Sequence, residues 1–131
     1  MPARRFTAVR TDKGRHAADA LVLATAAWTP TLAKQLGFKV WINPVKGYSA
    51  TVKLAGWNNA PRIAVMDDGL KIAIAPFGGN LRIAGTAEFT GWDPAMNERR
   101  ARNVLTTANG VFPELGQQAQ RAGATFWTGL R

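Results

Sequence analysis

Residues 62–84, RIAVMDDGLKIAIAPFGGNLRIA, decide the fold of this chain. Apolar residues alternate with small or polar residues along most of this stretch, which is the pattern of strands buried on one face. Two turn signals, Asp67-Asp68-Gly69 and Phe77-Gly78-Gly79-Asn80, separate the strand-like segments and favour tight hairpins. We therefore predict a three-stranded antiparallel meander. Its strands are 62–66, 70–75 and 81–84, with Ile72, Ile74, Leu81 and Ile83 facing the core.

The segment 39–54, which precedes the meander, is also strand-like. Pro44 and Gly47 interrupt it, and a central strand tolerates neither residue well. We therefore expect an edge, a bend or a bulge near these two residues.

The segment after the meander contains a predicted helix and a last strand. Asp93-Pro94 begins the helix, its apolar residues recur on one face, and Pro113 ends it. Residues 117–122 follow as a polar connector or a helical turn, and 124–130 as a strand. The predicted fold is an α+β layout, an antiparallel sheet with helices packed on it.

A different pattern occupies residues 18–30, ADALVLATAAWTP. The unbroken apolar run Leu21-Val22-Leu23 predicts a strand buried on both faces. Small residues follow, and Thr29-Pro30 then predicts a capped helix that ends at Gly37. This arrangement is either a plain strand-to-helix turn in a core or a turn that presents backbone N–H groups to a cofactor. The residues up to about Gly37 are expected to belong to a different sheet from the rest.

Composition narrows the function classes. The chain has 131 residues, no cysteine, a single histidine (His16) and a formal net charge of +9. Disulfides, thiolate metal sites, cysteine nucleophiles and histidine-rich metal sites are therefore excluded. The basic residues are scattered, and the chain contains no helix-turn-helix or zinc-finger pattern, which argues against nucleic acid as a partner. No apolar run is long enough to span a bilayer, so we expect a cytoplasmic protein or one at the cytoplasmic face of a membrane.

Two motifs carry candidate substrate-binding residues, and each has a purely structural alternative. Lys46-Gly47-Tyr48 places a cation and a phenol beside a glycine that lets a ligand approach, or it is a strand bulge with two exposed polar groups. Arg131 follows a glycine-containing strand and is either a bidentate ligand for a carboxylate or an ordinary surface arginine.

Further polar and aromatic residues are weaker candidates. Thr86 and Glu88 place a hydroxyl and a carboxylate at the end of a hairpin strand, or they belong to a capped turn. Most aromatic residues are expected in the core, but Trp41 and Trp127 are candidates for the wall of a pocket.

Taken in order, the motifs resemble a known family. Residues 9–14 and 18–24, VRTDKG and ADALVLA, are similar to the hairpin and strand before the second flavin-binding turn of glutathione-reductase-like flavoproteins. Four further motifs resemble the D-amino acid dehydrogenase branch of the D-amino acid oxidase superfamily, and the whole set covers nearly all of the chain. These motifs are Pro44-Val45-Lys46-Gly47-Tyr48-Ser49, Val65-Met66-Asp67, Gly85-Thr86-Ala87-Glu88 and Phe126-Trp127-Thr128-Gly129-Leu130-Arg131.

The resemblance implies an FAD-dependent enzyme that takes a hydride from the α-carbon of a D-amino acid, such as D-alanine, and yields a 2-oxo acid and ammonia. It also implies transfer of electrons to an acceptor of the respiratory chain, which is the reason to expect the cytoplasmic face of the inner membrane. The flavin carries the chemistry, so no catalytic protein base is required. By resemblance, Ala24, Thr25 and Ala26 contact the flavin, and Arg131, Tyr48 and Lys46 bind the substrate.

The resemblance further implies two domains and a missing remainder of the enzyme. Residues 1–38 correspond to part of an FAD-binding domain, and residues 39–131 to a substrate domain truncated at its C-terminal end. The family's G-x-G-x-x-G fingerprint is absent, and Ala26 stands where the family usually has glycine. We therefore expect this chain alone to hold FAD weakly and to be inactive. The alternative is a stand-alone, non-catalytic binding module that forms a homodimer through a sheet face or edge.

Overall fold

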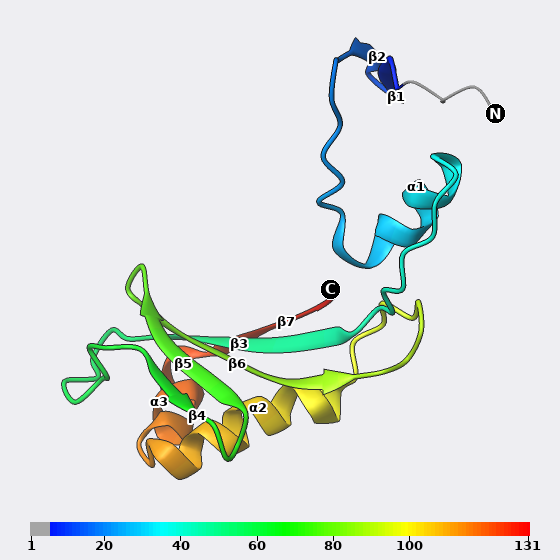
Figure 1. Ribbon diagram of the computed structural model, residues 1–131. Coiled ribbons are helices and arrows are strands. Elements are labelled where there is room, and N and C mark those ends of the chain that lie inside the picture. Colours follow the sequence, from blue (N-terminus) through cyan, green and yellow to red (C-terminus); the bar gives the residue numbers. More distant parts are fainter. Residues whose placement is uncertain (1–5) are drawn as a thin grey trace. The chain divides into compact units, whose positions relative to one another are not determined.

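The computed structural model describes residues 6–131. The chain divides into two compact units, Met1–Ile42 and Asn43–Arg131 (Figure 1). Residues 1–5 of the predicted first domain lie outside the described residues. The division falls close to the predicted boundary between residues 38 and 39, and each unit is described separately below.

The first unit contains a hairpin and a short helix. Strands β1 (Ala8–Thr11) and β2 (Gly14–Ala17) pair in antiparallel fashion. A 3₁₀ turn, η1 (Ala26–Trp28), then leads into helix α1 (Thr29–Gln35). Trp28 occupies the N-cap position of α1, one residue before the predicted cap. Gly37, with a φ of 87°, lies just beyond the helix, which confirms the predicted end.

The predicted buried strand at Leu21-Val22-Leu23 is wrong. The chain has no regular secondary structure there, and Val22 is 85% exposed. A buried strand needs neighbouring strands to complete its backbone hydrogen bonds. Within residues 6–131, the strands of the first unit are β1 and β2, and these pair with each other, so the apolar run has no sheet to join.

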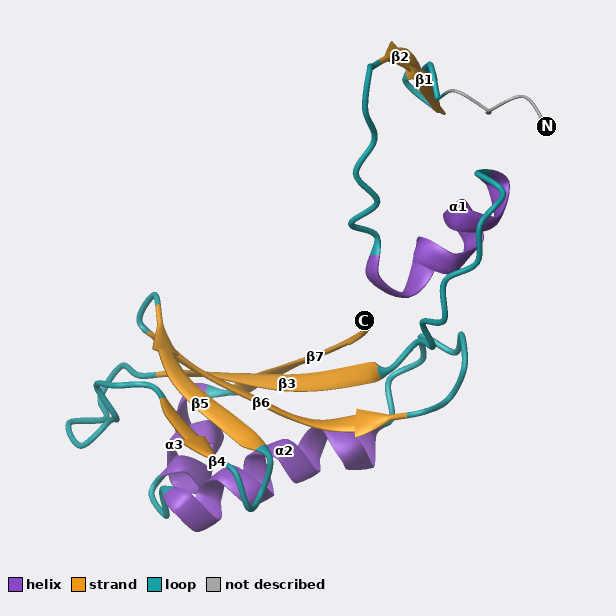
Figure 2. Ribbon diagram, in the orientation of Figure 1, coloured by secondary structure: helices purple, strands orange, loops and turns teal. Residues whose placement is uncertain are grey.

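The second unit is built on a five-stranded antiparallel sheet with the strand order β4-β5-β6-β3-β7 (Figure 2). The predicted meander is confirmed as β4, β5 and β6, and the last strand has the predicted bounds. The strands are β3 (Lys46–Lys53), β4 (Val65–Asp67), β5 (Ile72–Phe77), β6 (Asn80–Glu88) and β7 (Ala124–Leu130).

Helices α2 (Glu98–Val111) and α3 (Leu115–Ala122) pack on one face of this sheet (Figure 2). Ala101, Val104 and Ala108 of α2 are fully buried against the strands, as the helical spacing predicted. The predicted inward residues of the meander are confirmed too. Each of Ile72, Ile74, Leu81 and Ile83 is at most 2% exposed. No helix among the described residues has the length and apolar character of a membrane span.

Two helix predictions need correction. Helix α2 begins at Glu98 rather than at Asp93-Pro94, because the Asn97 side chain accepts a hydrogen bond from the backbone N–H of Arg100 at 3.2 Å and caps the helix there. The segment predicted as a polar connector or single turn is the whole helix α3, whose Leu115 is fully buried.

Strand β3 lies in the interior of the sheet, between β6 and β7, and it begins only at Lys46, after Pro44. The bulge predicted near Gly47 is confirmed. Gly47 pairs with Ala87 while Tyr48 pairs with Gly85, which leaves Thr86 as the extra residue of β6. Thr86 has a φ of 59°, a conformation that is rare for a β-branched residue.

Candidate functional site

The two faces of the second unit's sheet separate the candidate substrate residues. Successive side chains of a strand point to opposite faces. Tyr48 belongs to the core under α2 and α3, so Lys46 and Tyr48 project toward the helices. Gly47 lies on the other face, which we call the open face, and the side chain of Arg131 lies there beside it. The structure therefore brings Lys46 and Tyr48 together and places Arg131 on the opposite side.

Lys46 is the centre of a buried charge cluster on the helix-covered face. Its Nζ donates a hydrogen bond to the carbonyl oxygen of Ala95 at 2.7 Å. The same atom lies 3.3 Å from Glu88 Oε2 and 3.5 Å from Asp93 Oδ2. The Lys46 side chain is only 2% exposed. The alternative of two exposed polar groups on a bulge is therefore wrong.

Glu88 joins this cluster to the phenol and to helix α2. It accepts a hydrogen bond from the hydroxyl of Tyr48, and its Oε1 lies 2.9 Å from Nε of Arg100. The Glu88 carboxylate thus links two side chains of β3, Lys46 and Tyr48, to the first turn of α2. Because these two residues flank Gly47, the cluster holds the bulged part of β3 against β6.

The cluster favours the charged form of each of its ionisable members. Burial opposes the charge of Lys46, but the hydrogen bond with Glu88 and the charge of Asp93 outweigh it and raise the pKa of Lys46. The hydrogen bond from Tyr48 is the main cause that lowers the pKa of Glu88, and Lys46 adds to it. The pKa of Asp93 is lowered chiefly by the hydrogen bond from the backbone N–H of Ala95.

These shifts predict that the chain loses stability at both ends of the pH scale. A lowered carboxyl pKa stabilises the folded chain at neutral pH, and that contribution is lost as the pH falls below about 4, where Glu88 and Asp93 bind protons. A raised lysine pKa contributes fully below about pH 10, and its contribution is lost as the pH rises further and Lys46 deprotonates.

Urea denaturation of the 131-residue chain across this pH range would test the prediction. Glu88→Gln is expected to flatten the acid side of the stability profile. The matched control is Glu98→Gln, which removes a carboxylate from an exposed pair with Arg102 and should leave that side nearly unchanged. An acid side that is as steep in Glu88→Gln as in the parent would contradict the prediction.

Arg131 lies against the open face at Gly47. A Cβ placed on Gly47 would come within 3.3 Å of the Arg131 Nε and 3.4 Å of its Cζ. The backbone of Arg131 continues the pairing of β7 with β3, since Arg131 and Val45 each donate an N–H to the other's carbonyl at 2.9 Å. The absence of a side chain at Gly47 therefore makes room for the guanidinium group.

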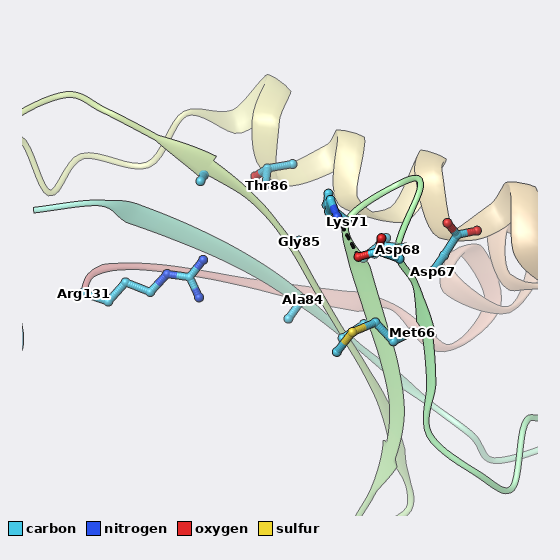
Figure 3. Close-up of a pocket in the computed structure, with 11 residues that line it drawn as sticks. Met66, Asp67, Asp68, Lys71, Ala84, Gly85, Thr86 and Arg131 are labelled. Carbon is cyan, nitrogen blue, oxygen red and sulfur yellow. Dashed lines mark hydrogen bonds and ion pairs between the residues drawn. The ribbon is translucent and has the colours of Figure 1, made fainter.

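A cavity of about 350 Å³ extends from Arg131 across the open face to Met66 (Figure 3). In Figure 3 the guanidinium of Arg131 points along the sheet, with Ala84 and Gly85 between it and Met66. The small residues leave a flat floor on which a ligand can lie. An arginine at one end of such a pocket can hold an anionic group while the rest of the ligand contacts apolar atoms.

The other charges of this pocket are already engaged. Lys71 Nζ lies 2.6 Å from Asp68 Oδ1, and Asp67 accepts a hydrogen bond from the backbone N–H of Leu70 at 2.8 Å. No ion pair within residues 6–131 uses the guanidinium of Arg131. This arginine is therefore the pocket's available group for an anion.

The three residues predicted to contact a flavin lie in the first unit, at the start of η1. Ala24 and Ala26 are exposed, and Thr25 is half-buried, with its Oγ1 3.1 Å from the Thr29 Oγ1. Ala26 has a φ of 44°, in the region where glycine is favoured. Small, exposed side chains on a tight turn fit the close approach of a flat group to the backbone. A metal is a different matter, since no group of three His, Asp or Glu among the described residues could hold one.

Sequence reasoning missed two members of the buried cluster, Asp93 and Arg100. Neither belongs to a local pattern that connects it with Lys46, because the three residues come from different segments. The available signal was the strand period itself. Lys46 shares a face with Tyr48 and the core residues after it, and a lysine that points inward needs an anionic partner.

The two tryptophans considered as pocket residues differ in their positions. Trp41 is 85% exposed in the first unit, where Lys39 Nζ lies 4.3 Å from its ring centre. Trp127 is 59% exposed on β7, and its ring lies over Gly129 on the open face. Neither lines the cavity beside Arg131.

Comparison with known proteins gives consistent matches. The family model described as DAO, FAD dependent oxidoreductase, matches residues 2–131. A D-amino acid dehydrogenase of Vibrio vulnificus strain YJ016 is 41% identical over 127 residues, which are 97% of this chain and 30% of that protein. A protein of Halorhodospira halophila, named as an uncharacterized oxidoreductase in the pyp 5′ region, is 41% identical over 94% of this chain and 56% of its own length. The chain thus spans about a third to a half of the relatives it matches.

A solved structure shows the same fold. The crystal structure of a glycine oxidase from Bacillus cereus matches with a TM-score of 0.68 at 21% identity, over 97% of this chain and 33% of that one. At this identity the match supports the fold alone.

Proposed function

This chain belongs to the DAO family of FAD-dependent oxidoreductases, and from that premise we propose that it is part of an enzyme that oxidatively deaminates D-amino acids to 2-oxo acids and ammonia. The support is the identity of about 40% to D-amino acid dehydrogenases of several bacteria, over nearly the whole chain. The alternative of a non-catalytic module gains no support from these comparisons.

One observation carries the proposal, namely the available guanidinium of Arg131 at the end of an open-face pocket. Every amino acid substrate carries an α-carboxylate, and a planar guanidinium can bind both of its oxygens. With the carboxylate at Arg131, the α-carbon and side chain of the substrate would lie over the small residues Ala84 and Gly85. In this proposal Lys46 and Tyr48 act from the helix-covered face, where they hold β3 in place.

The chain would contribute only part of the FAD site. Ala24, Thr25 and Ala26 would lie against the flavin, and the pyrophosphate would need the G-x-G-x-x-G segment that this sequence does not contain. When bound, FAD supplies the hydride acceptor for oxidation at the α-carbon. The chain's own residues bind and orient the substrate, so FAD binding by the chain alone should be weak.

The two units would have separate roles. Residues 1–38 would belong to an FAD-binding domain and residues 39–131 to a substrate domain, close to the division that the contacts show after Ile42. We further propose a respiratory-chain electron acceptor, which would place the enzyme at the cytoplasmic face of the inner membrane. A homodimer remains part of the proposal, with the β7 edge as its candidate contact.

A chimera tests the proposed function without any assumption about where this chain begins or ends. The aligned segment of the Vibrio vulnificus D-amino acid dehydrogenase is replaced by this chain, with which it shares 41% identity. We expect the purified chimera to show a flavin absorbance spectrum, to reduce an artificial electron acceptor with D-alanine, and to release pyruvate and ammonia.

L-Alanine is the control substrate and should give no reduction above background. A chimera that is folded and flavin-loaded but oxidises neither D-alanine nor a panel of other D-amino acids would overturn the proposal. The flavin spectrum separates this outcome from a chimera that fails to assemble.

A further inference from the structure

Two glycines face each other on the open face, and each lies under a flat side-chain group. Gly47 of β3 pairs in register with Gly129 of β7. The guanidinium of Arg131 lies over Gly47, and the indole ring of Trp127 lies over Gly129. Directly paired residues of an antiparallel sheet are about 5 Å apart, so the two flat groups occupy neighbouring places on one surface.

The space above each glycine is measured by the contacts that an added Cβ would make. At Gly47 that atom would come 3.3 Å from Nε of Arg131, which is closer than an ordinary contact. At Gly129 it would come 2.5 Å from Cζ2 and Cη2 of Trp127, a distance that the ring cannot tolerate. Neither glycine has a positive φ, so backbone conformation does not explain the residue type. The overlying side chains do.

The indole ring also restricts where Arg131 can go. Trp127, Gly129 and Arg131 alternate with the inward residues of β7 and therefore share the open face. With the ring lying flat over Gly129, the place beside Gly47 toward β7 is filled. The guanidinium is left to point the other way, across the sheet toward Ala84, where the pocket begins (Figure 3).

We propose that Gly47, Gly129 and Trp127 are positioning residues that together fix the direction of the Arg131 guanidinium for binding of the substrate carboxylate. Gly47 provides the surface on which the guanidinium rests. Gly129 lets the Trp127 ring lie flat, and the ring closes the side away from the pocket. This inference rests on the proposed function, because it assigns these residues a role through Arg131 in that same site.

The test uses the flavin-loaded chimera with Gly47→Ala and Gly129→Ala. Arg131 and Trp127 are exposed, so both can move away from the new methyl group at little cost in stability. We expect KM for D-alanine to rise about tenfold in each variant, with kcat changed by less than about threefold, because one misplaced charged hydrogen bond weakens binding by this order. The inhibition constant of propionate, which has the carboxylate but no amino group, should rise by the same factor.

Trp127→Ala supplies an independent variant that adds no atoms. It should raise KM and the propionate inhibition constant in the same direction, and its combination with Gly129→Ala should be no worse than the stronger single change, since both act by removing the ring from its place. Gly110→Ala is the matched control, because a Cβ there meets nothing within 4 Å. It should leave all constants unchanged.

The outcomes separate this inference from the proposed function. If the parent chimera oxidises no D-amino acid, the proposed function fails first. If the parent is active but Gly47→Ala and Gly129→Ala leave KM and the propionate constant unchanged, the positioning role is overturned. A fall in kcat with unchanged propionate binding would overturn it as well, because that pattern does not pass through the carboxylate.

Discussion

Arg131→Leu in the active chimera is expected to raise KM for D-alanine by about 100-fold or more. The substitution keeps an apolar stem over Gly47 but removes the pocket's available cation, so the substrate carboxylate would lose a charge-assisted, bidentate partner. Loss of one partner of a hydrogen-bonded charge pair costs about 2–5 kcal/mol in an enclosed site, which corresponds to a factor of this size in affinity.

Arg131→Lys refines this prediction. Lysine keeps the charge but offers a single ammonium in place of a planar fork, so an intermediate rise of about tenfold is expected. Steady-state kinetics with D-alanine and inhibition by propionate measure both effects. Arg102→Leu is the control, since Arg102 is an exposed α2 residue paired with Glu98. A KM for Arg131→Leu within about twofold of the parent value would remove the basis for placing the carboxylate there.

The second large effect concerns folding. Lys46→Ala is expected to lower the melting temperature of the 131-residue chain by about 10 °C or more. The substitution leaves the Ala95 carbonyl without its donor and leaves two carboxylates, Glu88 and Asp93, with one cation fewer. Because the Lys46 side chain is 2% exposed, water does not readily replace what is lost.

Lys71→Ala provides a demanding control for this prediction. The pair between Lys71 and Asp68 is shorter, at 2.6 Å, than any contact that Lys46 makes with a carboxylate, but both of its side chains are mostly exposed. If burial rather than distance decides the contribution, Lys71→Ala should change the melting temperature by no more than about 3 °C. Equal effects of the two substitutions, followed by circular dichroism, would contradict the argument.

A double-mutant cycle separates the pair from its surroundings. Lys46→Met with Glu88→Gln removes both charges while keeping side chains of similar length. We expect the double variant to be more stable than the sum of the two single changes predicts, because each single change leaves a partner behind. Additive effects would show that Lys46 and Glu88 do not act as a pair.

The elements that rest on local chemistry could be predicted from the sequence. The turn at Gly78-Gly79, the inward residues Ile72 and Ile74 and the last strand β7 all follow from patterns only a few residues long. Arg131 was identified by its motif, and the bulge at Gly47 by the effect of glycine on a strand. In each case the determining interactions lie within the segment itself or in its immediate hairpin neighbour.

Predictions that depended on distant partners were the ones that failed. The apolar run Leu21-Val22-Leu23 has the composition of a buried strand, but a strand exists only where another strand completes its hydrogen bonds. Asp93 was expected to begin a helix, whereas its carboxylate accepts from the backbone N–H of Ala95 and pairs with Lys46. No pattern within either segment records the position of its partner.

The sequence by itself therefore determined the strands and turns of the second unit, the side of each strand that is apolar, and the family to which the chain belongs. Only the tertiary structure decided what covers each face. The period of two tells that Lys46 and Tyr48 point one way and Gly47 the other, but helices far along the chain decide that the first direction is interior. That choice buries Lys46 and Tyr48 in an ion-pair cluster and leaves Arg131 on the open face, at the end of the pocket.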